Sequence, residues 1–139
     1  MISQIDHLGI AVESLDSALP LYRDLMGLEF NGIETVPDGQ SRVAFLQCSE
    51  VSIELLEPTA PDTPIGKFLA KRGEGFHHVC LRVNDIEEAR QRLSEGGLRL
   101  LDEKPRPGAH NTLVSFFHPK STRGILIEIA SHPGEYHQP

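Results

Sequence analysis

The sequence predicts an α+β fold made of two tandem βαβββ modules. The first observation is an internal repeat. Segments 5–30 and 76–101 both open with an apolar run whose third residue is histidine, and both continue with a polar turn, a helical pattern, a glycine and a short apolar run. The second observation is a matching later strand in each half, "VSIELLEP" at 51–58 and "ILIEIASH" at 125–132. A period this long that occurs twice is typical of a duplicated supersecondary unit rather than a solenoid.

A helix is expected after the first strand, and Gly27 marks its end. Ser14, Asp16 and Ser17 are each able to cap its N-terminus, because their side-chain oxygens accept hydrogen bonds from the first backbone N–H groups. Pro20 limits where the helix begins, since a proline beyond the first turn clashes with the preceding carbonyls. We therefore expect the helix to begin at Asp16 or Ser17.

The second module has a cleaner helix signal. Asp85 and Glu88 form a pair resembling a capping box, and Gly96 is expected to stop the helix. Between the modules, residues 62–73 are typical of a short helical linker with Pro64 in its first turn.

The remaining apolar runs are expected to be strands. They cover residues 28–34, 41–48, 51–57, 99–103, 112–118 and 124–130. Residues 1–139 are then a single domain whose modules span about 4–59 and 75–131. The final segment, 131–139, is expected to fray.

Composition excludes several functional classes. The net charge of −7 argues against nonspecific nucleic-acid binding. No apolar run approaches the length of a membrane span, and the N-terminus lacks the basic and apolar regions of a signal peptide. Two cysteines, Cys48 and Cys80, do not make a disulfide framework, so we expect a reduced cytoplasmic protein.

One histidine and one glutamate occupy matching positions in each module. His7 and His78 are 71 positions apart, and Glu54 and Glu128 are 74 positions apart. Each lies on the less apolar face of its strand, because side chains alternate between the two faces. A pseudo-twofold arrangement of the modules would bring the two imidazoles and two carboxylates together.

This set of side chains suits one divalent transition metal ion, such as Co, Zn, Ni, Mn or Fe. Four protein ligands with open positions are typical of a catalytic rather than a closed structural site. The ion would also compensate the charge of Glu128, which stands in the middle of an aliphatic run. Taken singly, each residue fits an ordinary hydrogen-bonded histidine or a solvated glutamate, and it is the matched set that predicts a metal.

Four segments make the chain resemble a known superfamily. They are "IDHLGIAV", "ELLEPTAPDTPIGKFLAKRGEGFHHVCLRV", "DEKPRPGAH" and "FFHPKSTRGILIEI". From about residue 5 to residue 129 the chain resembles the vicinal-oxygen-chelate (glyoxalase/bleomycin-resistance) superfamily, and within it the methylmalonyl-CoA epimerases. The resemblance implies an open eight-stranded, metal-lined cleft. The resemblance also implies that the metal ligands are His7, Glu54, His78 and Glu128. The second histidine of "FHHV" matches the ligand position of the family, so His77 is not expected to be a ligand.

The resemblance also implies an activity. Members of this family are isomerases of propionate metabolism that interconvert (2R)- and (2S)-methylmalonyl-CoA, removing the C2 proton to give a metal-stabilised enolate. It implies an acyl-CoA substrate and a homodimer. Glu128 is then expected to be one base, and Glu54 the base on the other face. Some members carry a further glutamate, and the matching position here is Val43, which cannot exchange protons.

Alternatives stay open. A lyase of the glyoxalase I type, acting on a glutathione hemithioacetal, would use the same metal and carboxylates. Other superfamily members only bind metals or antibiotics. A dioxygenase is disfavoured, because the facial triad of iron enzymes has two histidines and one carboxylate. Arg82 shares a strand face with His78, and both a role with a substrate carboxylate and a structural ion pair remain open for it.

Overall fold

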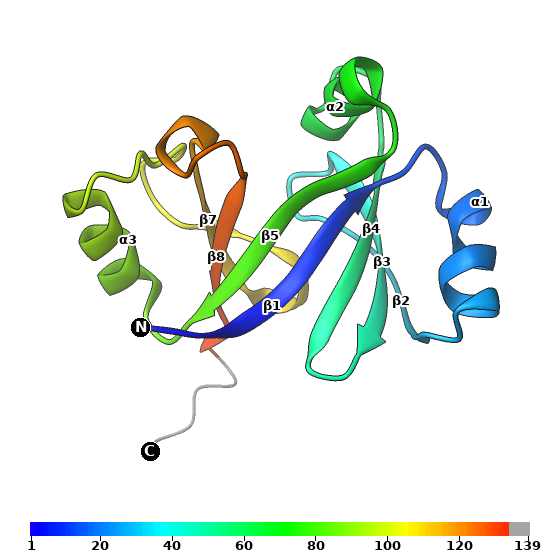
Figure 1. Cartoon of the computed structure of the whole chain (residues 1–139), viewed down its shortest axis with the longest axis horizontal. Coiled ribbons are helices and arrows are strands. Elements are labelled where there is room, and N and C mark those ends of the chain that lie inside the picture. Colours follow the sequence, from blue (N-terminus) through cyan, green and yellow to red (C-terminus); the bar gives the residue numbers. More distant parts are fainter. Residues whose placement is uncertain (134–139) are drawn as a thin grey trace. The chain divides into compact units, whose positions relative to one another are not determined.

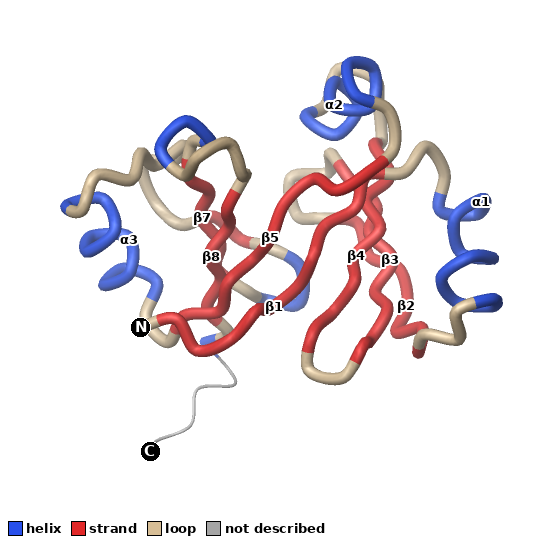
Figure 2. Tube along the Cα trace, in the orientation of Figure 1, coloured by secondary structure: helices blue, strands red, loops and turns tan. Residues whose placement is uncertain are grey.

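The structure is a computed structural model in which residues 1–133 are described. These residues form an α+β fold, as the sequence predicts. The strands are β1 (Ile2–Ala11), β2 (Glu29–Thr35), β3 (Ser41–Cys48), β4 (Val51–Pro58), β5 (Gly75–Val83), β6 (Arg106–Pro107), β7 (Leu113–Phe117) and β8 (Ile127–Ser131). The helices are α1 (Leu15–Leu19), the π-helix η1 (Pro20–Leu25), α2 (Pro64–Arg72), α3 (Ile86–Glu95) and two 3-10 turns, η2 (Ala109–Asn111) and η3 (Pro119–Ser121). Figure 2 shows where helices and strands fall along the trace.

The strands confirm the two predicted βαβββ modules. They are hydrogen-bonded in the order β2-β3-β4-β1-β5-β8-β7-β6. In the first module β1 pairs in parallel with β4, and β2, β3 and β4 are antiparallel neighbours. In the second module β5 pairs in parallel with β8, and β6, β7 and β8 are antiparallel neighbours. Both modules therefore have the same connectivity and the same mixture of parallel and antiparallel pairs.

The chain divides into two compact units. One contains His7–His77, and the other contains Met1–Asp6 together with the chain from His78 onward. Strands β1 and β5 each contribute residues to both units, because each boundary falls within one of these strands.

In the first unit α1 packs on the β3–β4 part of the sheet (Figure 1). The core between them consists of Val12, Leu15, Leu19, Ala44, Leu46 and Leu55. Because side chains on β3 alternate, Ala44 and Leu46 face the helix while Val43 and Phe45 point to the opposite face. That opposite face carries the candidate site residues of this unit.

The second unit repeats this plan with α3 and strands β5, β7 and β8 (Figure 1). Its core consists of Val83, Ile86, Ala89, Phe117 and Ile129. Phe117 and Ile129 face the helix, so their strand neighbours Phe116 and Glu128 point to the other face.

The first helix begins slightly earlier than predicted. Ser14 is the N-cap, with its side chain accepting a hydrogen bond from the Ser17 backbone N–H at 3.3 Å, and α1 begins at Leu15 rather than at Asp16. Pro20 does not prevent this, because α1 ends at Leu19 and the chain continues as a π-helix whose first residue is Pro20. A proline is tolerated at a first helical position, since the N–H it lacks would have no partner there.

The predicted strand at 99–103 is wrong. Leu100 makes only an isolated bridge to Phe117, and the strand next to β7 is the two-residue β6. The physical reason lies in Asp102, whose carboxylate accepts a hydrogen bond from the Phe116 backbone N–H at 3.4 Å and another from Arg90 Nη1 at 2.6 Å. A side chain therefore takes a backbone donor of β7 that a longer strand pairing would use.

The strand predicted at 124–130 begins later, since β8 covers Ile127–Ser131, while the segment between the modules contains a helix as expected. α2 falls within the segment expected to be helical, and the Thr63 side chain caps it by accepting a hydrogen bond from the Gly66 N–H at 3.1 Å. Of the segment expected to fray, Ser131 ends β8, while residues 134–139 lie outside the described part of the chain. Across residues 1–133, no helix combines the length and the apolar character needed to cross a membrane.

Candidate functional site

His7 and Glu54 form a close pair in the first unit. His7 Nδ1 lies 3.1 Å from Glu54 Oε2, and the two side chains are only 8% and 13% exposed. The register explains the contact, because His7 pairs with Ser52 and Gly9 pairs with Glu54 on the adjacent strand. His7 and Glu54 are therefore diagonal neighbours on one face, and Gly9 places no side chain between them.

His78 and Glu128 form the corresponding pair in the second unit. His78 Nε2 lies 3.1 Å from Glu128 Oε1, with side-chain exposures of 6% and 8%. Cys80 is the cross-strand partner of Glu128, so His78, two residues earlier on β5, is again the diagonal neighbour of the carboxylate. In each module the histidine and the glutamate singled out from the sequence are therefore in contact.

A phenylalanine lies beside each carboxylate. Phe45 is the cross-strand partner of Glu54, and Phe116 is the cross-strand partner of Glu128. Phe116 also meets the His78 ring edge-on, with the ring centroids 5.7 Å apart. These rings keep the surroundings of both carboxylates apolar, which strengthens electrostatic interactions made there.

Each of the two pairs, taken by itself, fits a divalent metal ion. Each joins an imidazole nitrogen to a carboxylate oxygen, and these are donor types that Zn, Co, Ni and Fe accept. Two donors at right angles on an ion, with bonds of about 2.1 Å, lie about 3.0 Å apart. Both pairs show 3.1 Å. Each unit thus supplies one imidazole and one carboxylate at a spacing consistent with ligands of a divalent metal.

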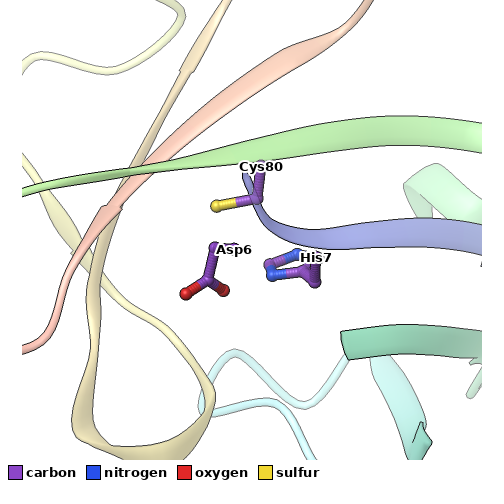
Figure 3. Close-up of side chains that lie close together, drawn as sticks. All are labelled: Asp6, His7 and Cys80. Carbon is purple, nitrogen blue, oxygen red and sulfur yellow. The ribbon is translucent and has the colours of Figure 1, made fainter. Parts of the chain in front are cut away.

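A second polar cluster surrounds Asp6 in the unit that contains the N-terminus. Arg82 Nε and Nη2 donate to Asp6 Oδ1 at 2.9 and 2.8 Å, and His132 Nε2 lies 2.7 Å from the same oxygen. Figure 3 shows Asp6 on β1 with the thiol of Cys80 close to its carboxylate. Of the two roles left open for Arg82, the structure shows the ion pair. The cluster fixes the first residues of β1 to β5 and to the end of β8.

Sequence reasoning missed a third cluster, around Asp102. Arg90 Nη1 donates to Asp102 Oδ1 at 2.6 Å and to Ser115 Oγ at 2.5 Å, and Arg90 is only 6% exposed. Arg106 Nε lies 3.5 Å from Asp102 Oδ2. The only sequence signal was the "DEKPRPGAH" segment, which contains Asp102 and Arg106, since Arg90 lies 12 positions before Asp102.

Two further sequence predictions concern residues beside the site. Val43, at the position where some relatives were expected to carry glutamate, is 1% exposed and is paired with Leu56 on β4. His77, expected not to be a ligand, meets the ring of Phe68 edge-on with centroids 4.9 Å apart.

Comparisons with known proteins identify the superfamily of the chain. Residues 6–116 match the family model of the Glyoxalase/Bleomycin resistance protein/Dioxygenase superfamily. The chain is 40% identical over 131 residues to the ethylmalonyl-CoA/methylmalonyl-CoA epimerase of Cereibacter sphaeroides, and this match covers 93% of this chain and 98% of that protein. It is 38% identical over 136 residues to uncharacterized protein YqjC of Bacillus subtilis, covering 98% of this chain and 97% of that protein.

A solved structure extends the comparison to a ligand complex. It is a variant of Streptomyces coelicolor methylmalonyl-CoA epimerase in complex with 2-nitronate-propionyl-CoA. That chain is 33% identical to this one, the match covers 100% of both, and the TM-score is 0.92. Proteins similar to this chain over its whole length thus include one that binds an acyl-CoA ligand.

Proposed function

Since the chain belongs to the glyoxalase/bleomycin resistance protein/dioxygenase superfamily, we propose that it is a metal-dependent isomerase that interconverts (2R)- and (2S)-methylmalonyl-CoA. The observation that carries the proposal is the pair of buried imidazole–carboxylate contacts, His7–Glu54 and His78–Glu128, at 3.1 Å each. The whole-length similarity to named epimerases supports the substrate class. The reaction would give the protein a role in propionate metabolism.

In this proposal both pairs hold one divalent metal ion, so that His7, Glu54, His78 and Glu128 are its ligands. The ion, when bound, supplies a Lewis acid that lowers the energy of negative charge on the oxygens of the substrate. The two imidazoles are neutral donors, and the two carboxylates supply charge that balances the cation.

The chemistry requires removal of a weakly acidic proton. C2 of methylmalonyl-CoA stands between a thioester and a carboxylate, so loss of its proton gives an enolate whose charge is delocalised onto oxygen. A carboxylate placed next to C2 accepts that proton as a general base. Glu128 has this role in our proposal, because it lies beside Phe116, where an apolar neighbour limits competition from water.

An epimerase must also return a proton on the opposite face of the planar enolate. We assign this step to Glu54, which has the same register position in its module as Glu128 has in the other. Val43 cannot exchange protons, so the position that carries an acid in some relatives offers no base in this chain. Two bases on opposite faces are the simplest device for inverting a carbon centre.

The test is deuterium wash-in at C2. We expect the purified chain to exchange the C2 proton of methylmalonyl-CoA in deuterated water, to lose this activity with a chelator, and to regain it when a divalent metal is added back. No exchange, combined with turnover of a glutathione hemithioacetal, would instead indicate a lyase of the glyoxalase I type. No turnover of either substrate would indicate a binding protein and contradict the proposal.

A further inference from the structure

The strand registers allow a position-by-position comparison of the two site faces. Residues paired across neighbouring strands form rows on the site face, and Glu54 or Glu128 lies in one such row. The next row on the same face of each module contains four residues, one from each of its four strands. In the first module this row is Ala11, Leu56, Val43 and Glu34. In the second module it is Arg82, Ala130, Val114 and Arg106. The equivalent positions thus hold an alanine and an acid in one module and two arginines in the other.

The two arginines differ in how tightly their ion-pair partners hold them. Arg82 directs both Nε and Nη2 at the Asp6 carboxylate, at 2.9 and 2.8 Å. Arg106 is held more loosely, with only its Nε near Asp102, at 3.5 Å, and its side chain is 52% exposed. Asp102 is also bonded to the buried Arg90 at 2.6 Å. Two guanidinium groups therefore share one carboxylate, which leaves a positive charge at this end of the face.

Phe116 fixes where that charge lies. The Arg106 guanidinium carbon is 5.8 Å from the centroid of the Phe116 ring, a cation–π arrangement. Phe116 is in turn the direct cross-strand partner of Glu128 and contacts the His78 ring. Phe116 thus contacts both the exposed guanidinium and the row that holds the carboxylate that we propose as a base. The ring contact therefore orients the positive charge beside this row.

We infer that Arg106 binds the free carboxylate of a malonyl-type thioester and so selects substrates that carry one. The guanidinium fork matches a carboxylate in geometry and charge. Its position near Glu128 is suitable because the carboxylate of such a substrate is bonded directly to the carbon that loses its proton. This inference rests on the proposed function. A phosphate of CoA is the other group with matching chemistry.

Binding measurements with three probes distinguish the two sources. Malonyl-CoA carries the carboxylate and the phosphates, acetyl-CoA lacks the carboxylate, and malonyl-pantetheine lacks the phosphates of the nucleotide. We expect Arg106→Gln to weaken binding of malonyl-CoA and malonyl-pantetheine about 10- to 100-fold by calorimetry, while acetyl-CoA changes less than about twofold. Arg92→Gln, at an exposed site on α3, is the matched control and should change none of the three.

Three results would overturn the inference. One is that Arg106→Gln weakens both CoA esters and leaves malonyl-pantetheine unaffected, which would make Arg106 a phosphate ligand. Another is that none of the three affinities changes, and the third is that all three fall equally. If Arg106→Gln does not fold, Arg106→Met, which keeps an aliphatic stem over Phe116, gives the same test.

Different experimental results would contradict this inference and the proposed function. Absence of C2 exchange by the unaltered chain contradicts the proposed function. Equal loss for all three probes, in a chain that does exchange C2, contradicts the role of Arg106 alone.

Discussion

The two modules share one plan and differ in the side chains next to it. In both, a histidine lies diagonal to a glutamate at 3.1 Å, and a phenylalanine lies across from that glutamate. The residue on the other side of the glutamate is Gly9 in the first module and Cys80 in the second. The repeated register is thus sufficient to build two similar imidazole–carboxylate pairs, while the neighbouring row contains a glutamate in the first module and two arginines in the second. Such an asymmetry suits a substrate whose two ends differ.

We expect the largest effects on activity from replacing the two glutamates, and we expect the two replacements to differ in size. We expect Glu128→Gln to slow epimerisation about 10³-fold or more and Glu54→Gln about 10²-fold, since each removes one proton acceptor. In a two-base mechanism each variant should still exchange the C2 proton of the epimer that faces the remaining base. The measurement is deuterium wash-in with the resolved (2R) and (2S) thioesters. Glu29→Gln, on an exposed position of β2, is the control.

The two modules are not equivalent in catalysis if only one of the two glutamates transfers protons. Full epimerisation by Glu54→Gln together with inactivity of Glu128→Gln would mean that the first module supplies no base. Proton return on the second face would then need another group, and the equivalence of the modules would be limited to binding.

The second prediction compares the two cores. Phe117 and Leu46 are both 0% exposed and both lie between sheet and helix, in the second and first modules respectively. Truncating Phe117 to alanine should cost about 4 kcal/mol of unfolding free energy, and Leu46→Ala about 3 kcal/mol, because the larger side chain leaves the larger cavity. Urea denaturation followed by circular dichroism measures both. A cost below about 1 kcal/mol for Phe117→Ala would show that its module does not fold around this ring.

The third prediction concerns metal affinity. His7→Ala and His78→Ala should each weaken binding of a divalent metal about 100-fold, measured by competition with a chromophoric chelator. His77→Ala is a closely matched control, because it removes the neighbouring imidazole, which packs against Phe68. Unchanged affinity in His7→Ala alone would mean that the second module binds the ion without the first.

The fold was predictable from sequence because its signals are local. Alternation along a strand placed His7 and Glu128 on the site faces, and the repeat identified their partners. The errors have tertiary causes. The strand expected at 99–103 failed because the Asp102 carboxylate, which also bonds to Arg90, accepts the Phe116 N–H that a longer strand pairing would use.

The candidate site was predictable only in part for the same reason. The four proposed ligands repeat with the module, so the sequence shows them twice. Arg106 has no such counterpart, since the equivalent position in the first module is Glu34. Its placement beside Phe116 depends on a two-residue strand that carries no periodic signal.

The smallest predicted effect lies at the helix starts, where the modules again differ. In the second module the Asp85 side chain accepts a hydrogen bond from the Glu88 N–H at 3.1 Å. In the first module Ser14 accepts from Ser17 at 3.3 Å, but the Leu15 N–H is also bonded, at 2.7 Å, to the carboxylate of a residue on β4, Glu57. The first helix therefore has two side-chain caps.

This difference should appear in unfolding free energies measured with urea. Asp85→Ala should cost about 1 kcal/mol, the usual value for losing an N-cap. Ser14→Ala should cost about 0.5 kcal/mol, because Glu57 still satisfies one N–H group and its negative charge still favours the positive end of the helix dipole. Combining Ser14→Ala with Glu57→Gln should then cost more than the two single changes added together, since each cap compensates for loss of the other. Strict additivity would mean that the carboxylate from β4 ties the strand to the loop without supporting the helix, and that the two helices are held at their N-termini by equivalent single caps.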